Sequence, residues 1–141
     1  MMVTEENEIS NVNEAFYHAF ESLDIRNMEK VWANESYIQC IHPGWGRLRG
    51  WEPVMASWRR IFENTQEIHF ILTEVQIEIQ NSLAWVTLYE NITSRLGDEV
   101  VTGVVLATNI YEKRPGGWFI IHHHGSSVAQ SPNQLNPSTV H

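Results

Sequence analysis

The chain has 141 residues, a formal net charge of −8 and an apolar fraction of 43%. This length suits a single domain, and the apolar fraction is ordinary for a globular protein. The acidic balance argues against nucleic-acid binding, because phosphate contacts need a surplus of Lys and Arg on one face. The only cysteine, Cys40, cannot form an internal disulfide, and no apolar run approaches the ~20 residues that span a bilayer. We therefore expect a soluble, cytoplasmic protein that binds neither nucleic acid nor membranes.

The first half of the chain has the apolar spacing of helices. Apolar residues recur at steps of three and four over three segments, residues 10–23, 25–32 and 51–62. Asp24 is suited to cap the second of these helices. Between the second and third, residues 37–41 form a short β-like run, and a polar, Gly-rich loop follows over residues 42–50.

The second half predicts four strands, over residues 67–79, 83–95, 100–113 and 118–126. Several of them are apolar on both faces, as in the run VVLA at residues 104–107. An antiparallel sheet with helices on one side normally keeps its other side polar. We therefore expect a second copy of the chain to cover the outer face, giving a homodimer formed through the sheet. Residues 1–127 are expected to form one domain, and residues 128–141 a flexible tail rich in Ser, Pro, Asn and Gln.

The order of these elements resembles a known family. The likeness covers about residues 9–127 and is carried by the segments IHPGWGRLRGWEPVMASWRRIF, AWVTLYE, ATNIYEK and GGWFIIHHHGSS. Together they resemble the SnoaL-like branch of the nuclear transport factor 2 and ketosteroid isomerase superfamily. The resemblance implies an α+β fold, cystatin-like, in which a curved antiparallel sheet forms a cone-shaped half-barrel closed by N-terminal helices. It also implies a pocket for a small, mostly apolar ligand. Members of the superfamily include isomerases, cyclases, dehydratases, hydrolases and proteins without known activity.

The resemblance extends to single residues of the ketosteroid isomerases. Their general base precedes a Pro-Gly-type loop, a position that His42 holds here, before Pro43. Their enolate-binding Asp on a late strand corresponds to Asn109, and their oxyanion Tyr falls near Phe16, next to Tyr17. The changed residue types argue against a steroid isomerase. An imidazole near its ordinary pKa and an amide could still abstract a proton next to a carbonyl and hold the enolate, without a cofactor.

A non-catalytic alternative stays open for the same two positions. In a ligand-binding or dimerisation module, His42 would cap the Pro-Gly turn and Asn109 would make a strand or dimer contact. The two readings differ in whether both side chains point into one cavity.

Aromatic and acidic residues supply further candidates for contacts with a small-molecule ligand. Trp45 lies in the Gly-rich loop, whereas Trp58 has the helical spacing of a core residue. Glu90 stands in an apolar strand, where it is either a partnered acid/base group or a carboxylate on the solvent side.

Three consecutive histidines suggest a metal or ligand contact near the end of the chain. On a strand, His122 and His124 share one face and His123 takes the other. A catalytic zinc needs three protein ligands, so this run alone predicts no metal site. The expected ligand-binding residues are Tyr17, Trp45, Trp58, Glu90, His122 and His124.

Overall fold

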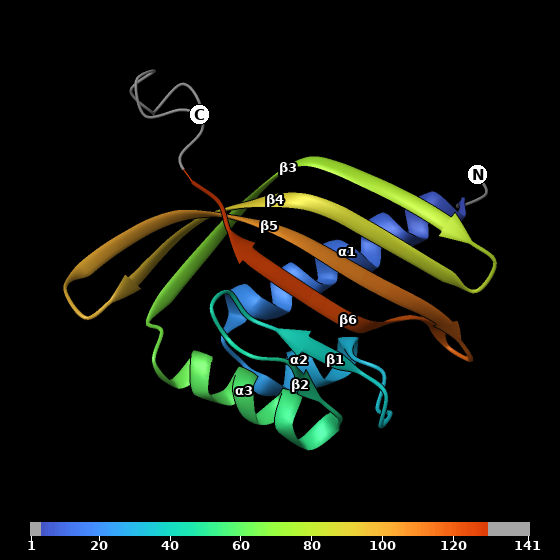
Figure 1. The fold of residues 1–141 in the computed structure, drawn as a ribbon, viewed down its shortest axis with the longest axis horizontal. Helices are drawn as coiled ribbons and strands as arrows, with labels where there is room; N and C mark the ends of the chain where they lie inside the picture. The colour runs from blue at the N-terminus through green and yellow to red at the C-terminus, as the bar shows by residue number, and fades with distance from the viewer. Residues whose placement is uncertain (1–3, 130–141) are drawn as a thin grey trace.

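The computed structural model describes residues 4–129, which form three helices and one six-stranded curved sheet (Figure 1). The helices are α1 (Glu5–Ser22), α2 (Ile25–Val31) and α3 (Trp51–Glu63). The strands are β1 (Gln39–Ile41), β2 (Leu48–Arg49), β3 (Glu67–Gln80), β4 (Leu83–Leu96), β5 (Glu99–Arg114) and β6 (Gly117–Ser127). The predicted α+β class, with a curved sheet packed against N-terminal helices, is confirmed. Apart from Val128 and Ala129, the tail predicted to be flexible lies outside the described residues.

Helix α1 begins at Glu5 rather than at the predicted residue 10. The side chain of Thr4 accepts a hydrogen bond from the backbone N–H of Asn7 at 3.1 Å, which caps the helix. Three acidic residues in the first turn interact favourably with the positive end of the helix dipole. These first turns carry few apolar residues, so the apolar spacing alone misses them. Asp24 caps α2 as predicted, through its carboxylate.

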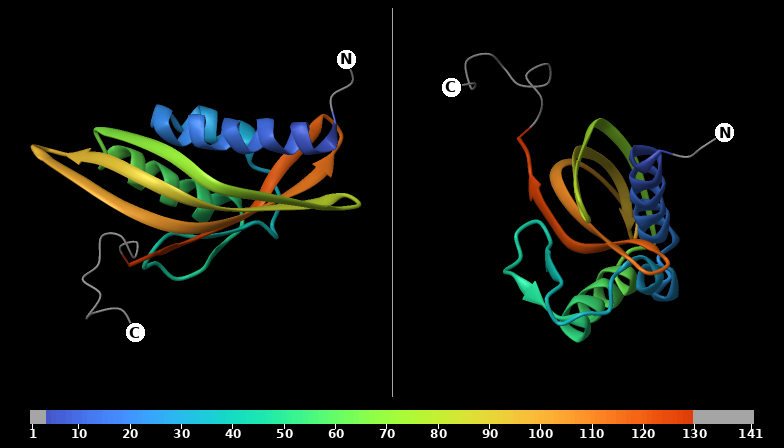
Figure 2. Two further views of the ribbon diagram at one scale, coloured as in Figure 1. Left: turned by 90° about the horizontal axis from the view of Figure 1, so that it is seen from above. Right: turned by 90° about the vertical axis from the view of Figure 1, so that its right-hand side faces the viewer.

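The sheet has the strand order β2-β1-β6-β5-β4-β3. All neighbouring strands are antiparallel except β1 and β6, which run parallel. The short strand β2 lies inside the loop predicted to be irregular and pairs with β1. Asn81 and Gly97 have φ values of 57° and 66° in the tight turns that join β3 to β4 and β4 to β5. The long strands curve strongly, and the far end of the β4–β5 hairpin projects beyond the helices (Figure 2).

The helices cover one face of the sheet, here called the interior face. Aromatic residues of α1 and α3 pack edge to face there, with the rings of Phe20 and Trp58 4.8 Å apart between centroids. The opposite face, here called the outer face, leaves large apolar side chains in solvent, among them Ile71 at 69% and Leu106 at 40% exposure. Within residues 4–129, no helix combines the length and the apolar character needed to cross a membrane.

Candidate functional site

The register of the sheet aligns polar residues on the interior face. Asn109 of β5 lies opposite His123 of β6, and His123 lies opposite Cys40 of β1. On β4, Glu90 alternates onto the same face. All four of these residues are buried. Strand pairing does not itself require polar residues at these positions. The sheet therefore carries a row of polar groups beneath the helices.

Asn109 is the centre of a buried hydrogen-bond network. Its amide nitrogen donates to Asn13 Oδ1 and to the Tyr17 hydroxyl, each at 3.1 Å. Its carbonyl oxygen lies within hydrogen-bond distance of His123 Nδ1. The Tyr111 hydroxyl also donates to Asn13 Oδ1, at 2.8 Å. Both amide hydrogens of Asn109 are thus bonded to residues of α1. Asn109 therefore does not present a free donor to a ligand.

Glu90 is joined to this network through α1. The Tyr17 hydroxyl donates to Glu90 Oε2, and Glu90 is only 3% exposed. Burial raises the pKa of the Glu90 carboxyl from 4.5 to about 7, and the hydrogen bond from Tyr17 partly opposes that rise. Burial also raises the pKa of the Tyr17 phenol well above 10, and the neighbouring carboxylate adds to the rise. The acid/base reading of Glu90, one of the two left open by the sequence, fits this placement, since the carboxyl is not on the solvent side.

His42 follows β1 and forms a second buried group with α3. Its Nε2 atom lies 2.9 Å from Ser57 Oγ and 3.6 Å from Cys40 Sγ. Burial lowers the pKa of His42 from 6.5 to about 4 and raises the pKa of the Cys40 thiol. The ring of Trp45 lies 4.9 Å from that of His42 and is itself partly exposed, so it covers the histidine from the loop side.

The histidine run does not continue the alternation of inward- and outward-facing residues that precedes it on β6. Trp118 and Ile120 face the interior, but Ile121 is an extra residue in a β-bulge opposite Ile110 and Tyr111. The bulge shifts the alternation by one, so that His123 points inward. His122 and His124 lie on the outer face, with ring centroids 6.3 Å apart.

The predicted site residues thus divide into two groups. The interior brings together His42, Asn109, Tyr17, Trp58 and Glu90. Trp45 lies at the surface above His42, and His122 and His124 are separated from the others by the sheet. The roles predicted for His42 and Asn109 in catalysis, and for the others in ligand binding, stay predictions.

Four further members of the interior network were missed from the sequence. They are Asn13, Ser57, Tyr111 and His123. Asn13 stands four residues after Ile9 and four before Tyr17, which are buried on α1, so helical spacing could have revealed it. His123 could not be placed without knowledge of the bulge.

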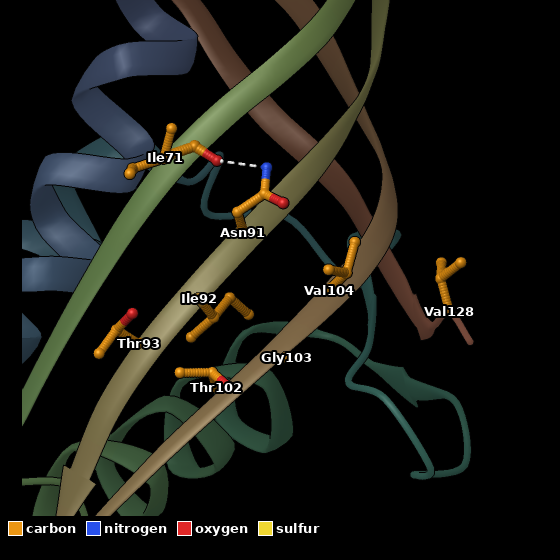
Figure 3. A pocket seen from close by; sticks show the side chains of 8 residues that line it. All are labelled: Ile71, Asn91, Ile92, Thr93, Thr102, Gly103, Val104 and Val128. Carbon is orange, nitrogen blue, oxygen red and sulfur yellow. Dashed lines mark hydrogen bonds between the residues drawn. The ribbon is translucent and has the colours of Figure 1, made fainter. Parts of the chain in front are cut away.

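The interior network is closely packed in the free chain. Its residues are 0–5% exposed. A hollow of about 410 Å³ lies instead on the sheet where β3, β4 and β5 bend, and Figure 3 shows Ile71, Asn91 and Val104 around it. None of the interior polar residues lines that hollow. Among residues 4–129, no three His, Cys, Asp or Glu side chains gather as a metal site would require.

This fold and its buried polar cluster define a protein of the nuclear transport factor 2-like, or cystatin-like, class. The chain belongs to the SnoaL-like domain family, whose model matches residues 9–130. The predicted family and fold are therefore confirmed.

Solved structures of this class resemble the chain over most of its length. One is a candidate dehydratase of the nuclear transport factor 2-like family from Streptomyces avermitilis, 35% identical, with a TM-score of 0.82 over 87% of this chain and 95% of that one. Another, described as a candidate calcium/calmodulin-dependent protein kinase type II association domain from Thiobacillus denitrificans, is 31% identical. Its TM-score is 0.74 over 84% of this chain and 93% of that one.

A curated plant protein is also similar. The F-box protein SKIP8 of Arabidopsis thaliana is 31% identical over 129 residues. The match covers 90% of this chain but only 52% of that protein. The chain thus spans about half the length of this relative.

Proposed function

We propose that the chain is a cofactor-independent acid–base enzyme that binds a small, mostly apolar carbonyl compound at the interior network and transfers a proton next to the carbonyl. The observation that carries this proposal is Glu90, a carboxyl group buried in an apolar sheet and held by the Tyr17 hydroxyl. Burying such a group lowers the stability of the fold, so its presence needs a reason other than folding. Groups whose pKa values are shifted towards neutrality are frequent at catalytic sites. The similarity to a candidate dehydratase at 35% identity supports the same class of reaction.

Glu90 is better suited than His42 to exchange protons at neutral pH. A general acid or base works best when its pKa lies near the working pH, and burial brings the pKa of Glu90 to about 7. Burial lowers the pKa of His42 to about 4, so its imidazole is neutral at pH 7 but a weaker base than free imidazole. The argument from an ordinary imidazole pKa therefore does not hold for His42. Asn109 orients Tyr17 and His123 rather than offering a free donor.

Access to this network requires the covering residues to move, because its side chains are at most 5% exposed. Loop residues 43–46 are exposed, and Trp45 of this loop stacks edgewise against His42. Outward motion of this loop would uncover His42 and give a ligand a route towards the network. Loop motions of this kind commonly gate active sites.

Solvent-deuterium exchange tests the proposal directly. Small cyclic and aromatic ketones are incubated with the protein in D2O, and deuterium at the carbon next to the carbonyl is followed by NMR. We expect catalysed exchange for part of this panel and a loss of at least about 100-fold in Glu90→Gln, the size typical of a lost acid–base group. Tyr17→Phe should lower the rate less, since the carboxyl group remains.

The matched control is Glu78→Gln, which removes an exposed carboxylate from β3. It should leave the exchange rate unchanged. Absence of catalysed exchange across the panel, or an unchanged rate in Glu90→Gln, would contradict the proposed activity.

We also propose that two copies of the chain associate through the outer face. Directly paired residues at its centre are uncharged, including Trp85 with Ile110 and Tyr89 with Leu106. The chain has a net charge of −8, so two copies repel each other where their carboxylates meet. The uncharged centre of the outer face allows two copies to pack together there without such repulsion. The similarity to a candidate association domain, at 31% identity, supports an assembly role. This role is compatible with catalysis, because the two faces of the sheet are separate.

A further inference from the structure

Strand β5 extends past the end of its neighbour β6. It begins at Glu99, whereas β6 ends at Ser127, which lies opposite Val105. On its other side β5 is paired with β4 from Glu99 onwards. Residues 99–103 of β5, here called the open edge, therefore have a partner strand on one side only within the described part of the chain.

One hydrogen bond determines which backbone groups face the open edge. The N–H of Val128 donates to the carbonyl oxygen of Val104 at 2.9 Å, so the backbone groups of Val104 point to the β6 side. Successive residues of a strand point their backbone groups alternately to its two neighbours, and the β4–β5 register has no bulge over this stretch. Thr102 and Val100, two and four residues before Val104, therefore point their N–H and C=O groups to the same side. The open edge thus offers two donors and two acceptors to an added strand.

The outermost strands of the sheet are protected against strand addition. Strand β2 has only two residues. Strand β3 has a bulge that includes Glu74, carries a second exposed carboxylate at Glu78, and has its Phe70 N–H bonded to the Glu21 carboxylate at 2.9 Å. Short strands, charged residues and bulges are the usual means by which proteins prevent pairing at sheet edges. Residues 100–103, with the sequence VVTG, have no charge, no proline and no bulge.

The side-chain surroundings of the open edge indicate what kind of strand it would accept. The hollow of about 410 Å³ borders this edge, since Thr102, Gly103 and Val104 line it together with residues of β3 and β4, and none of its lining residues is charged (Figure 3). At the tip of the hairpin, Asp98 and Glu99 are exposed and form no ion pair within residues 4–129. We propose that the open edge binds an extended segment of a partner protein as an added antiparallel strand.

The register of such a strand defines the chemistry of the partner. A side chain opposite Thr102 lies on the same face as the hollow, and the uncharged lining of the hollow favours an apolar group there. A Lys or Arg opposite Glu99 would pair with its carboxylate. In strand addition, backbone hydrogen bonds supply affinity and side-chain pockets supply specificity. This binding goes beyond the proposed enzymatic function, because it uses neither Glu90 nor the interior network.

A short peptide tests the proposal in the full chain. The probe is the acetylated and amidated peptide LTVK, whose Leu lies opposite Thr102 and whose Lys lies opposite Glu99 in the proposed register. In ¹H–¹⁵N spectra we expect the amide signals of Thr102 and Val100 to shift downfield as the peptide is added. The N–H groups of Val101 and Gly103 face β4, so their signals should move less.

Two N-methylated peptides give a matched pair. Methylation of the peptide's Val nitrogen removes the N–H that would donate to the Val100 carbonyl, and should raise the dissociation constant about five- to tenfold. Methylation of the peptide's Thr nitrogen, which points away from β5, should leave it nearly unchanged.

The protein offers a second matched pair. Thr102→Pro removes a donor from the open edge without removing a hydrogen bond to β4, and should weaken binding by a similar factor. Thr102→Val retains the N–H and should bind the peptide as the parent does. If Thr102→Pro fails to fold, the two methylated peptides still decide the question.

Equal affinities of the two methylated peptides, or unmoved Thr102 and Val100 signals up to about 10 mM peptide, would overturn the proposal. Amide hydrogen exchange at Thr102 without peptide identifies other occupants. Slow exchange that depends on protein concentration would assign the open edge to a second copy. Slow exchange that does not depend on concentration would assign it to another part of the same chain. Either result would also overturn the binding of a partner strand, which requires fast exchange at Thr102 in the free protein.

Discussion

Glu90 makes the stability of the fold depend on pH. Its pKa is about 7 in the folded chain, against 4.5 when unfolded. Between these values the folded state binds more protons than the unfolded state, so the free energy of unfolding falls as pH rises. The contribution of Glu90 is fully present below pH 4.5 and is lost as pH rises through 7. The change amounts to about 3 kcal/mol at most.

The variant Glu90→Gln isolates this effect from that of the histidines. His42, whose pKa is lowered to about 4, acts in the opposite direction between pH 4 and 6.5 in both proteins. From pH 4.5 to 7 the free energy of unfolding of the variant should therefore rise relative to that of the parent, because only the parent loses the contribution of Glu90. Urea denaturation at a series of pH values measures it. A difference that stays constant over this range would show that Glu90 titrates normally.

At the residue scale, the sequence indicates which side chains are unusual but not which partners they find. Glu90 is conspicuous because its strand is otherwise apolar, yet its partner Tyr17 lies 73 residues away on a helix. Asn109 was assigned from a family position as a donor to a ligand. Its donors are instead taken by Asn13 and Tyr17, because α1 crosses the sheet at that point. Such pairings depend on how helix and sheet pack, which local spacing does not encode.

At the scale of elements, the close packing of β6 against Val105 of β5, with the turn after β1 also in contact, limits what can occupy Gly125. A Cβ atom on Gly125 would lie 2.9 Å from Val105 Cγ1 and 3.5 Å from Pro43 Cγ. Because Val105 is branched and buried, it has little freedom to move aside. Gly125→Ala should lower the free energy of unfolding by about 1–3 kcal/mol, the usual range for overpacking, as measured by chemical denaturation.

Gly103 on β5 provides the matched control for this substitution. A Cβ atom there would have no neighbour within 4 Å, and its φ is not in the left-handed region. Gly103→Ala should be neutral or raise stability by up to about 1 kcal/mol, because Ala loses less backbone freedom than Gly in a strand. Equal effects of the two substitutions would rule out the close contact at Gly125 as the cause.

Elements were predictable where local chemistry determines them. The tight turns at Asn81 and Gly97 and the cap at Asp24 follow from residue types that tolerate or satisfy those conformations. The bulge at Ile121 was not predictable, because no local signal marks the extra residue in an apolar strand. That single residue decides that His123, and not His122 or His124, faces the interior.

At the scale of the whole molecule, the sheet offers two faces with different uses. The interior face holds the polar network beneath the helices, whereas the outer face exposes apolar residues over its centre. The sequence indicated this excess of apolar residues through strands that are apolar on both sides. It could not show that the buried side would be closely packed around polar groups, since packing density depends on the complete set of neighbours.

The proposed dimer can be tested with one residue on each face of the hairpin. Leu106, 40% exposed, lies at the centre of the outer face opposite Tyr89. Leu106→Lys would place an unpaired charge in the interface, which favours separation of the two copies. Leu96, 43% exposed, is near the tip of the same hairpin and alternates onto the other face, so Leu96→Lys is the control. In sedimentation at micromolar concentration, the parent and the Leu96 variant should have twice the 16.3 kDa mass of one chain, and the Leu106 variant that of a single chain. A parent protein that sediments as a single chain would exclude this assembly.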